Sequence, residues 1–469
     1  MITTIARKEW TAIVRDGRFR WTGATVLGLL AIALVTGWQD VAAQRQAIDT
    51  ARHSEDSVWL DQGEKNPHSA AHFGQYAFKP TPPVAWVDRG VNDYLGTAVW
   101  MEAHSQNPFQ MRPAEDATAL GRFSALTASW TLQLLLPLLI VLLAFDAFAG
   151  EREQGTLRQL LSLGIRPRDL ALGKALGISM ALAVVLVPAL ILGVAILLLF
   201  FSGSGMTDTL ARALVLSGGY LVYFAAFLGI ALAVSAWART ARAALLALLG
   251  FWIISGLLVP RLAADLAERV HPTPSQQAFY EGIAEDEAAG MNGLGTRAER
   301  RENLEKELLS QYGVETLDEL PGNFAGLSLQ ASEEHSNLVF DKHFGELWET
   351  YRKQEDMHRL AALASPLLAV RALSMGVAGT DVEQHRHFAE AAETHRRILV
   401  KQLNDDMAEN AVGYIADEAL WSQAPPFEYQ SPGLGWVLQR QAVSLILLAL
   451  WALVATVAAV HRAGRLQPT

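Results

Sequence analysis

Six long apolar runs constrain this chain more than any other feature of its sequence. Each run approaches the roughly 20 helical residues that a bilayer core of about 30 Å requires. Because a membrane interior offers no water to backbone amides, each run is expected to be an α-helix. The runs are continuous, so they do not fit the alternating strands of an outer-membrane barrel. The predicted spans are residues 21–38, 125–149, 175–201, 213–237, 243–260 and 442–460.

The first run has an alternative interpretation as a cleaved signal peptide. A basic stretch precedes it, and Ala42 and Ala43 follow it. However, the run is long for the apolar part of a signal peptide, and five more spans follow. We therefore interpret residues 21–38 as a membrane helix.

The distribution of Lys and Arg predicts the orientation of the chain. If all six helices cross, one side holds residues 1–20, residues 150–174, the turn between spans four and five, and the tail 461–469. Together these segments carry 14 Lys and Arg residues against five acidic residues. Short basic loops stay on the cytoplasmic side. Both termini are therefore expected in the cytoplasm, in a multi-pass protein of the bacterial inner (plasma) membrane.

Two long inserts hold the remaining mass on the other side. The first, residues 39–122, is interrupted by Pro and Gly, which argues against one regular element. The second, residues 261–439, has mostly helical periodicity. Its predicted helices cover residues 297–312, with Gly313 as a C-cap, and residues 327–363 and 382–411. The expected fold class is an all-α membrane protein of six transmembrane helices with a mostly helical extracytoplasmic domain.

The residue types exclude several functions. There is no cysteine, so disulfides, thiolate metal sites and cysteine nucleophiles are excluded. The net charge of −10 gives no support for a nucleic-acid partner. No G-x-x-x-x-G-K-[S/T] phosphate loop exists, because Gly173 and Lys174 are followed by Ala175 and open a span. We therefore assign no catalytic, cofactor-binding or metal-binding residue and do not expect an enzyme.

Residues 1–20 are predicted to form an amphipathic helix on the inner membrane face. Ile2, Ile5 and Ile13 can share one side, with basic residues elsewhere. Basic residues near anionic headgroups fit this placement in the lipid interface. The alternative is an ordinary basic tail that only sets topology.

The loop at residues 150–174 is the most informative segment. Leu157, Leu160 and Leu161 are spaced i, i+3, i+4, which gives a short helix one apolar stripe. Acidic residues at its start favour the helix dipole. Such a helix requires a partner, either the membrane surface or another protein.

This loop carries the pattern E-R-E-Q-G-T-L-x-x-L-L from Glu151, then R-P-R-D-L from Arg166, and G-K before the next span. The pattern resembles the hallmark of ABC-2-type permeases. In that family the segment is a coupling element that docks on the ATPase subunit, and residues 1–20 resemble the family's elbow helix. The resemblance implies the following coupling residues: Glu151, Glu153, Gly155, Thr156, Leu157, Leu160, Leu161, Arg166 and Arg168.

The large inserts resemble those of a subset of the family with big extracytoplasmic domains. In that subset, segments like those at residues 71–78, 102–107 and 379–381 recur. The inserts depart from the commonest members, and this departure leaves the substrate unspecified.

The resemblance implies the permease subunit of an ATP-driven ABC exporter. ATP and Mg²⁺ would belong to a separate cytoplasmic ATPase dimer. Six spans are half of the usual complement, so a second permease copy, identical or paralogous, is expected beside this one in the bilayer. Two alternatives stay open. One is ATP-driven mechanical transmission to an extracytoplasmic partner without transport, and the other is a membrane-anchored metal-handling protein.

Asp146 is a further candidate, because it lies near the inner end of the second span. An ionisable group within a span is a candidate functional residue. The alternative is that a carboxylate so close to the helix end is simply solvated there.

Histidines are the last candidates, and 11 of the 12 lie in the two inserts. His68 and His72 are four residues apart, a spacing that can ligate zinc on one helix face. His385, His387 and His395 share one predicted helix. The absence of H-E-x-x-H argues against a metalloprotease.

Overall fold

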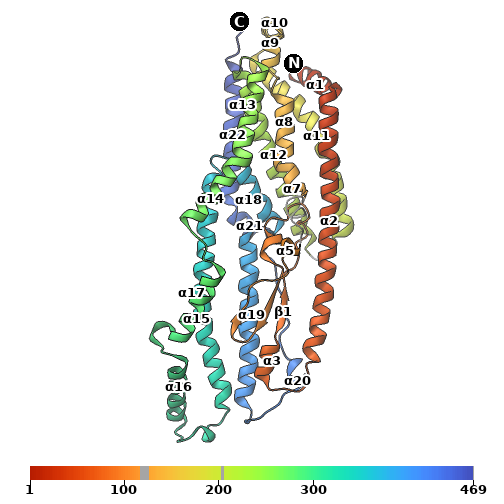
Figure 1. The fold of residues 1–469 in the computed structure, drawn as a ribbon. Helices are drawn as coiled ribbons and strands as arrows, with labels where there is room; N and C mark the ends of the chain where they lie inside the picture. Colours follow the sequence, from red (N-terminus) through yellow and green to blue (C-terminus); the bar gives the residue numbers. More distant parts are fainter. Residues whose placement is uncertain (117–125, 202–204, 468–469) are drawn as a thin grey trace.

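The structure, a computed structural model, describes residues 1–116, 126–201 and 205–467. Figure 1 shows an elongated helical protein with both termini at one end, which we call the terminal end. Within these described ranges, six helical stretches are long and apolar enough to cross a membrane, which confirms the predicted number and the helical class. They are α2 (Gly17–Leu60), α7 to α9 (Ala128–Glu153), α11 (Pro167–Phe200), α12 (Met206–Trp237), α13 to α14 (Ala241–Val270) and α22 (Ala442–Gly464). The predicted end of the first insert at 122 and the predicted start of span two at 125 lie outside the described residues.

The N-terminal helix α1 (Ile2–Arg15) ends before residue 20, where the sequence predicted its end. Asp16 has extended backbone angles, φ −70° and ψ 127°, which break the helix. Its side chain accepts a hydrogen bond from the backbone amide of Arg18 at 2.8 Å and so caps the start of α2. The chain therefore turns sharply between α1 and the first membrane helix.

Two membrane helices continue far beyond their predicted spans. Helix α2 contains 44 residues, so it is about 66 Å long at 1.5 Å per residue. The stretch α13 (Ala241–Ile253), η2 (Ile254–Leu258) and α14 (Val259–Val270) likewise runs on to Val270. Both extensions lead from the membrane part into the inserts (Figure 1).

Two π-helical turns interrupt the membrane helices near the inserts: η1 (Thr131–Leu135) before α8 (Leu136–Ala144), and η2. A π turn disturbs the regular backbone pairing, and an apolar bilayer supplies no replacement partner. In η1, side chains of neighbouring helices supply hydrogen-bond donors to the backbone carbonyls. Tyr223 Oη donates to the Gln133 carbonyl at 2.8 Å, and Trp252 Nε1 donates to the Leu134 carbonyl at 3.0 Å. These hydrogen bonds tie neighbouring helices together.

The two inserts fold together at the far end from the termini, and we call their described residues, 39–116 and 261–439, the insert domain (Figure 1). The first insert contributes α3 (Pro67–Phe73), β1 (Gln75–Phe78), α4 (Asn92–Leu95), β2 (Ala98–Glu102), β3 (Ser105–Gln106) and α5 (Pro113–Asp116). The second contributes α15 (Gln276–Ala289), η3 (Met291–Gly293), α16 (Arg297–Tyr312), η4 (Leu317–Glu319), α17 (Phe324–Ala361), α18 (Pro366–Ala378), α19 (Val382–Glu409), α20 (Glu418–Trp421) and α21 (Leu434–Arg440).

Helix α16 ends as predicted, because Gly313 adopts the left-handed conformation, φ +68°, that a C-cap requires. The first insert contains a small antiparallel sheet of order β1-β2-β3, with Tyr76 opposite Trp100. The sheet was not predicted. It packs on α19, where Val99 and Met101 share an apolar cluster with Phe388. The two inserts therefore form one folded unit.

Candidate functional site

The loop at 150–174 forms two short helices, α9 (Ala149–Glu153) and α10 (Thr156–Ser162), at the terminal end of the molecule (Figure 1). We call residues 149–168, which contain both helices and the turn after them, the coupling segment. The sequence predicted one short helix in this loop. The break falls at Gly155, whose φ of +72° is a left-handed conformation that a side chain disfavours. Thr156 Oγ1 then donates to the Glu151 carbonyl at 3.2 Å and closes the turn.

A cluster of charges anchors the coupling segment to the rest of the protein. Lys174, on α11, is only 1% exposed, and its Nζ lies 2.9 Å from the Glu151 carboxylate. The same Nζ lies 3.3 Å from both carboxylate oxygens of Glu9, on α1. Lys8 Nζ adds a contact of 3.3 Å to Glu151. The carboxylate of Glu151 thus joins α1, α9 and α11.

Close helix packing makes this cluster possible. Gly173 and Gly177 flank Lys174 on the face of α11 that contacts α1. A Cβ atom at Gly177 would lie 2.8 Å from the Ala6 carbonyl oxygen, and one at Gly173 would lie 2.6 Å from Ile5. Small residues four apart allow such close backbone approach. The lysine between them therefore reaches the acidic residues directly.

A second set of contacts fixes the base of the coupling segment to the turn between α12 and α13. The Arg152 guanidinium donates to the carbonyls of Ala236, at 2.9 Å, and Ala238. Ser235 Oγ accepts from the backbone amide of Phe148 at 2.9 Å. Neither Arg152 nor Ser235 was singled out from the sequence. These contacts connect the segment to α12 and to the turn that follows it.

The apolar stripe of the coupling segment faces its own protein. Leu157 is buried in the membrane core cluster, and Leu160 and Leu161 pack against that cluster. The outer face is polar, with one large apolar side chain, Leu163, which is 78% exposed. The exposed residues of this face are Glu153, Gln154, Arg158, Gln159, Ser162, Leu163, Arg166 and Arg168. Of the residues implied by the resemblance, Glu153, Arg166 and Arg168 are therefore the surface ones.

Asp146 lies in the turn between α8 and α9, at the terminal end of its membrane stretch. Its side chain is 39% exposed, and its carboxylate lies 3.8 Å from the Arg18 guanidinium. A partly exposed carboxylate beside a cation is the arrangement expected of a solvated helix end.

A large cavity of about 1390 Å³ opens where the insert domain meets the membrane helices. Its membrane-side lining includes Gln133 and Pro260. Arg371 of α18 and aromatic side chains of both inserts, such as Trp100 and Trp348, line the rest. Ligand sites combine apolar walls with a few placed polar groups. The composition of this cavity is of that kind.

Buried acids set the electrostatics of the cavity. Burial raises the pKa of Glu355 to about 7, although the Arg359 guanidinium, 3.5 Å away, favours the charged form. Burial likewise raises the pKa of Asp88 and of Asp381. Asp88 accepts a hydrogen bond from Ser374 Oγ, and the Gly90 amide donates to it at 3.0 Å. Burial thus shifts the acids of the cavity toward the neutral form, and the partly buried Arg359 guanidinium lies beside one of them.

Residues 99–254 match the family model described as "ABC-2 family transporter protein". This part of the chain belongs to the ABC-2 transporter family. Residues 279–430 match a second family model, described as "Domain of unknown function (DUF3526)". No curated protein matches the chain.

The ABC-2 match begins within β2 and ends at the first residue of η2, so it contains the whole coupling segment. It also contains Lys174, Arg152 and Ser235, whose role in anchoring the segment was not predicted from the sequence. Lys174 did carry a signal, since a lysine in an apolar run requires a partner. The matched part of the chain is therefore a membrane permease region of the ABC-2 family, and its coupling segment is folded into the helix bundle.

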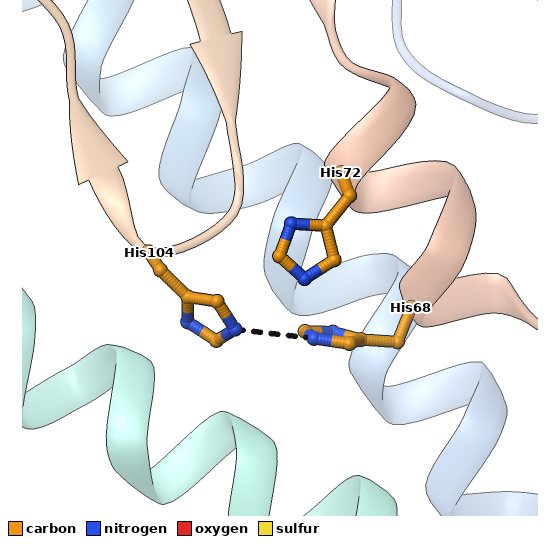
Figure 2. Close-up of side chains that lie close together, drawn as sticks. All are labelled: His68, His72 and His104. Carbon is orange, nitrogen blue, oxygen red and sulfur yellow. Dashed lines mark hydrogen bonds between the residues drawn. The ribbon is translucent and has the colours of Figure 1, made fainter.

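Three histidines meet in the insert domain (Figure 2). His68 and His72 come from α3 as the spacing predicted, and His104 comes from the turn between β2 and β3. Their candidate ligand atoms lie within 4.8 Å of one another, and within the described ranges no other group of three or more potential ligands is found. His385 and His387 do not join them. His385 lines the cavity, and His387 Nδ1 lies 2.9 Å from Tyr429 Oη.

Proposed function

We propose that this ABC-2 protein is the permease subunit of an ATP-driven exporter, with its terminal end in the cytoplasm of a bacterial inner membrane. The observation that carries the proposal is the coupling segment. It presents an outer face with charged side chains and one exposed leucine, and it is anchored to the three helices α1, α11 and α12. A separate ATPase dimer would bind this face and hydrolyse ATP with Mg²⁺, and a second permease copy would complete the transporter.

The anchoring contacts suggest how motion would pass through the chain. Displacement of the coupling segment would pull on α1 and α11 through Lys174, and on the α12–α13 turn through Arg152. The cavity between the membrane helices and the insert domain offers a place for the transported compound. Since acids and aromatic rings both line it, an amphipathic compound fits its chemistry.

The surface position of Leu163 and Arg158 gives a direct test. We expect Leu163→Asp with Arg158→Glu to reduce the amount of ATPase that copurifies by at least about tenfold, because a central apolar contact is lost and a charge is reversed. The measurement is affinity purification of the C-terminally tagged chain from mild detergent, with identification of any P-loop ATPase.

A matched control is Leu338→Asp, which changes an exposed leucine of the insert domain. It should retain the wild-type amount of ATPase. If wild-type protein brings down no ATPase, the permease proposal is rejected. If the double variant retains its ATPase at wild-type levels, the coupling face is elsewhere.

A second candidate function is mechanical work on an extracytoplasmic partner without transport. Helix α2 favours it, since one uninterrupted helix of 44 residues would carry motion from the membrane into the insert domain. The chain contains no cysteine, so spin labels can be placed at chosen sites. Cysteines would replace Asp56 and Lys306, and each would carry one spin label. The distance between the two labels should change when the assembled complex binds ATP, without any added transport compound. An unchanged separation, with two labels on α2 as reference, would count against mechanical transmission.

A further inference from the structure

The three-histidine cluster is built from two separate segments of the first insert. His68 and His72 lie one turn apart on α3, so both imidazoles leave the same face of the helix. His104 occupies the β2–β3 turn with φ +63°, a left-handed conformation that Asn, Asp and His adopt more often than other side chains. The three ring centroids are 4.8 to 5.0 Å apart. Figure 2 shows the rings turned toward a common point.

The second nitrogen of two of these rings is held by an acceptor. His104 Nδ1 lies 2.5 Å from the Glu333 carboxylate, which also pairs with Arg396. His68 Nδ1 lies 2.9 Å from Asn404 Oδ1. The Asn404 amide nitrogen donates to Gln330, which fixes the oxygen toward the histidine. Both Nδ1 atoms therefore carry the proton and donate it.

This assignment leaves a lone pair on each Nε2 atom. The Nε2 atoms of His68 and His104 face one another at 3.2 Å. Two lone pairs at that distance repel unless an electrophile lies between them, which must be a metal ion or an added proton. A tetrahedral zinc site with Zn–N bonds of about 2.0–2.1 Å places its nitrogen ligands about 3.3 Å apart. The observed separation fits that value.

We propose that His68, His72 and His104 bind one Zn²⁺ ion. His72 is exposed, so its side chain is free to move the short distance that brings its ring nitrogen into line. The Nδ1 contacts to Glu333 and Asn404 are the outer hydrogen bonds by which metal-binding histidines are oriented. Three neutral imidazoles suit zinc, with a water molecule as the fourth ligand on the exposed side.

The zinc would join parts of the insert domain that are distant in sequence. Its ligands come from α3 and the β2–β3 turn, and their outer partners come from α17 and α19. Bound metal would therefore hold the first insert against the long helices of the second, and it stabilises only the folded state. This inference does not depend on the proposed transport function.

The test is Zn²⁺ binding to the purified full-length chain, prepared without a polyhistidine tag and stripped with chelator. We expect one Zn²⁺ per chain in a competition titration, a zinc-dependent rise in melting temperature, and a zinc absorption spectrum with about three nitrogen ligands at 2.0–2.1 Å. His72→Ala should weaken binding at least tenfold, while the partly buried pair His68 and His104 keeps its contacts. His104→Asn, which tolerates the left-handed turn, should abolish it.

His53→Ala is the matched control, because His53 is an exposed histidine on a helix of the same insert. It should bind zinc as tightly as the wild type. Binding that is equal in all variants would overturn the proposal, as would wild-type protein that binds no zinc. If the wild-type protein binds no zinc, the electrophile between the Nε2 atoms of His68 and His104 is a proton and not a metal ion.

Discussion

Lys174→Met is expected to lower the free energy of unfolding by about 3–5 kcal/mol, the range found when one partner of a buried ion pair is removed. Lys174 is almost completely buried and pairs with Glu9 and Glu151. Without it, two carboxylates remain close together, and only the exposed Lys8 is left to compensate them. The measurement is unfolding of the purified protein by SDS titration in mixed micelles.

The triple variant Lys174→Met, Glu9→Gln, Glu151→Gln separates charge from packing. It removes the stranded carboxylates together with the cation, so it should regain most of the lost stability. Arg168→Met, a change at an exposed cation of the same loop, should have little effect. Equal losses in the single and triple variants would mean that packing of the lysine stem, not its charge, holds the coupling segment in place.

The six membrane helices were predictable because their signal is local. An apolar run of sufficient length identifies each one without knowledge of its neighbours. An apolar run cannot indicate how far a helix continues into polar sequence. The predicted first span therefore ended at residue 38, where the apolar residues end. Helix α2 continues to Leu60 through a polar, amphipathic stretch whose contacts come from the insert domain. The strands β1 to β3 were missed because two to five residues carry too little pattern.

The candidate site was predictable only in part, for a related reason. The stripe Leu157, Leu160 and Leu161 was recognised from its spacing, but spacing does not say which surface it meets, and it meets its own helices. The partners Glu9 and Lys174 are 165 residues apart. His104 is 36 residues from His68. Only the folded chain brings such residues together, so the ion cluster and the third histidine lay beyond pattern reasoning.

The acid in the cavity makes stability depend on pH in a predictable direction. The pKa of Glu355 is about 7 in the folded protein, because burial disfavours the carboxylate, against an ordinary value of 4.5. The folded state therefore binds the proton more tightly than the unfolded state does. The contribution of Glu355 to the free energy of unfolding is fully present below pH 4.5. It is lost as the pH rises toward 7 and is absent above pH 7.

We therefore expect Glu355→Gln to gain stability relative to the wild type as the pH is raised from 5 to 8, by up to about 3 kcal/mol at 1.36 kcal/mol per pKa unit. The glutamine keeps the shape but cannot ionise. Unfolding of both proteins should be measured across that range. The control is Glu349→Gln on the same helix, where the hydrogen bond from Arg352 lowers the pKa of the carboxyl group, so any effect has the opposite sign. Parallel pH profiles for wild type and Glu355→Gln would show that Glu355 is hydrated and ionised in the cavity at neutral pH.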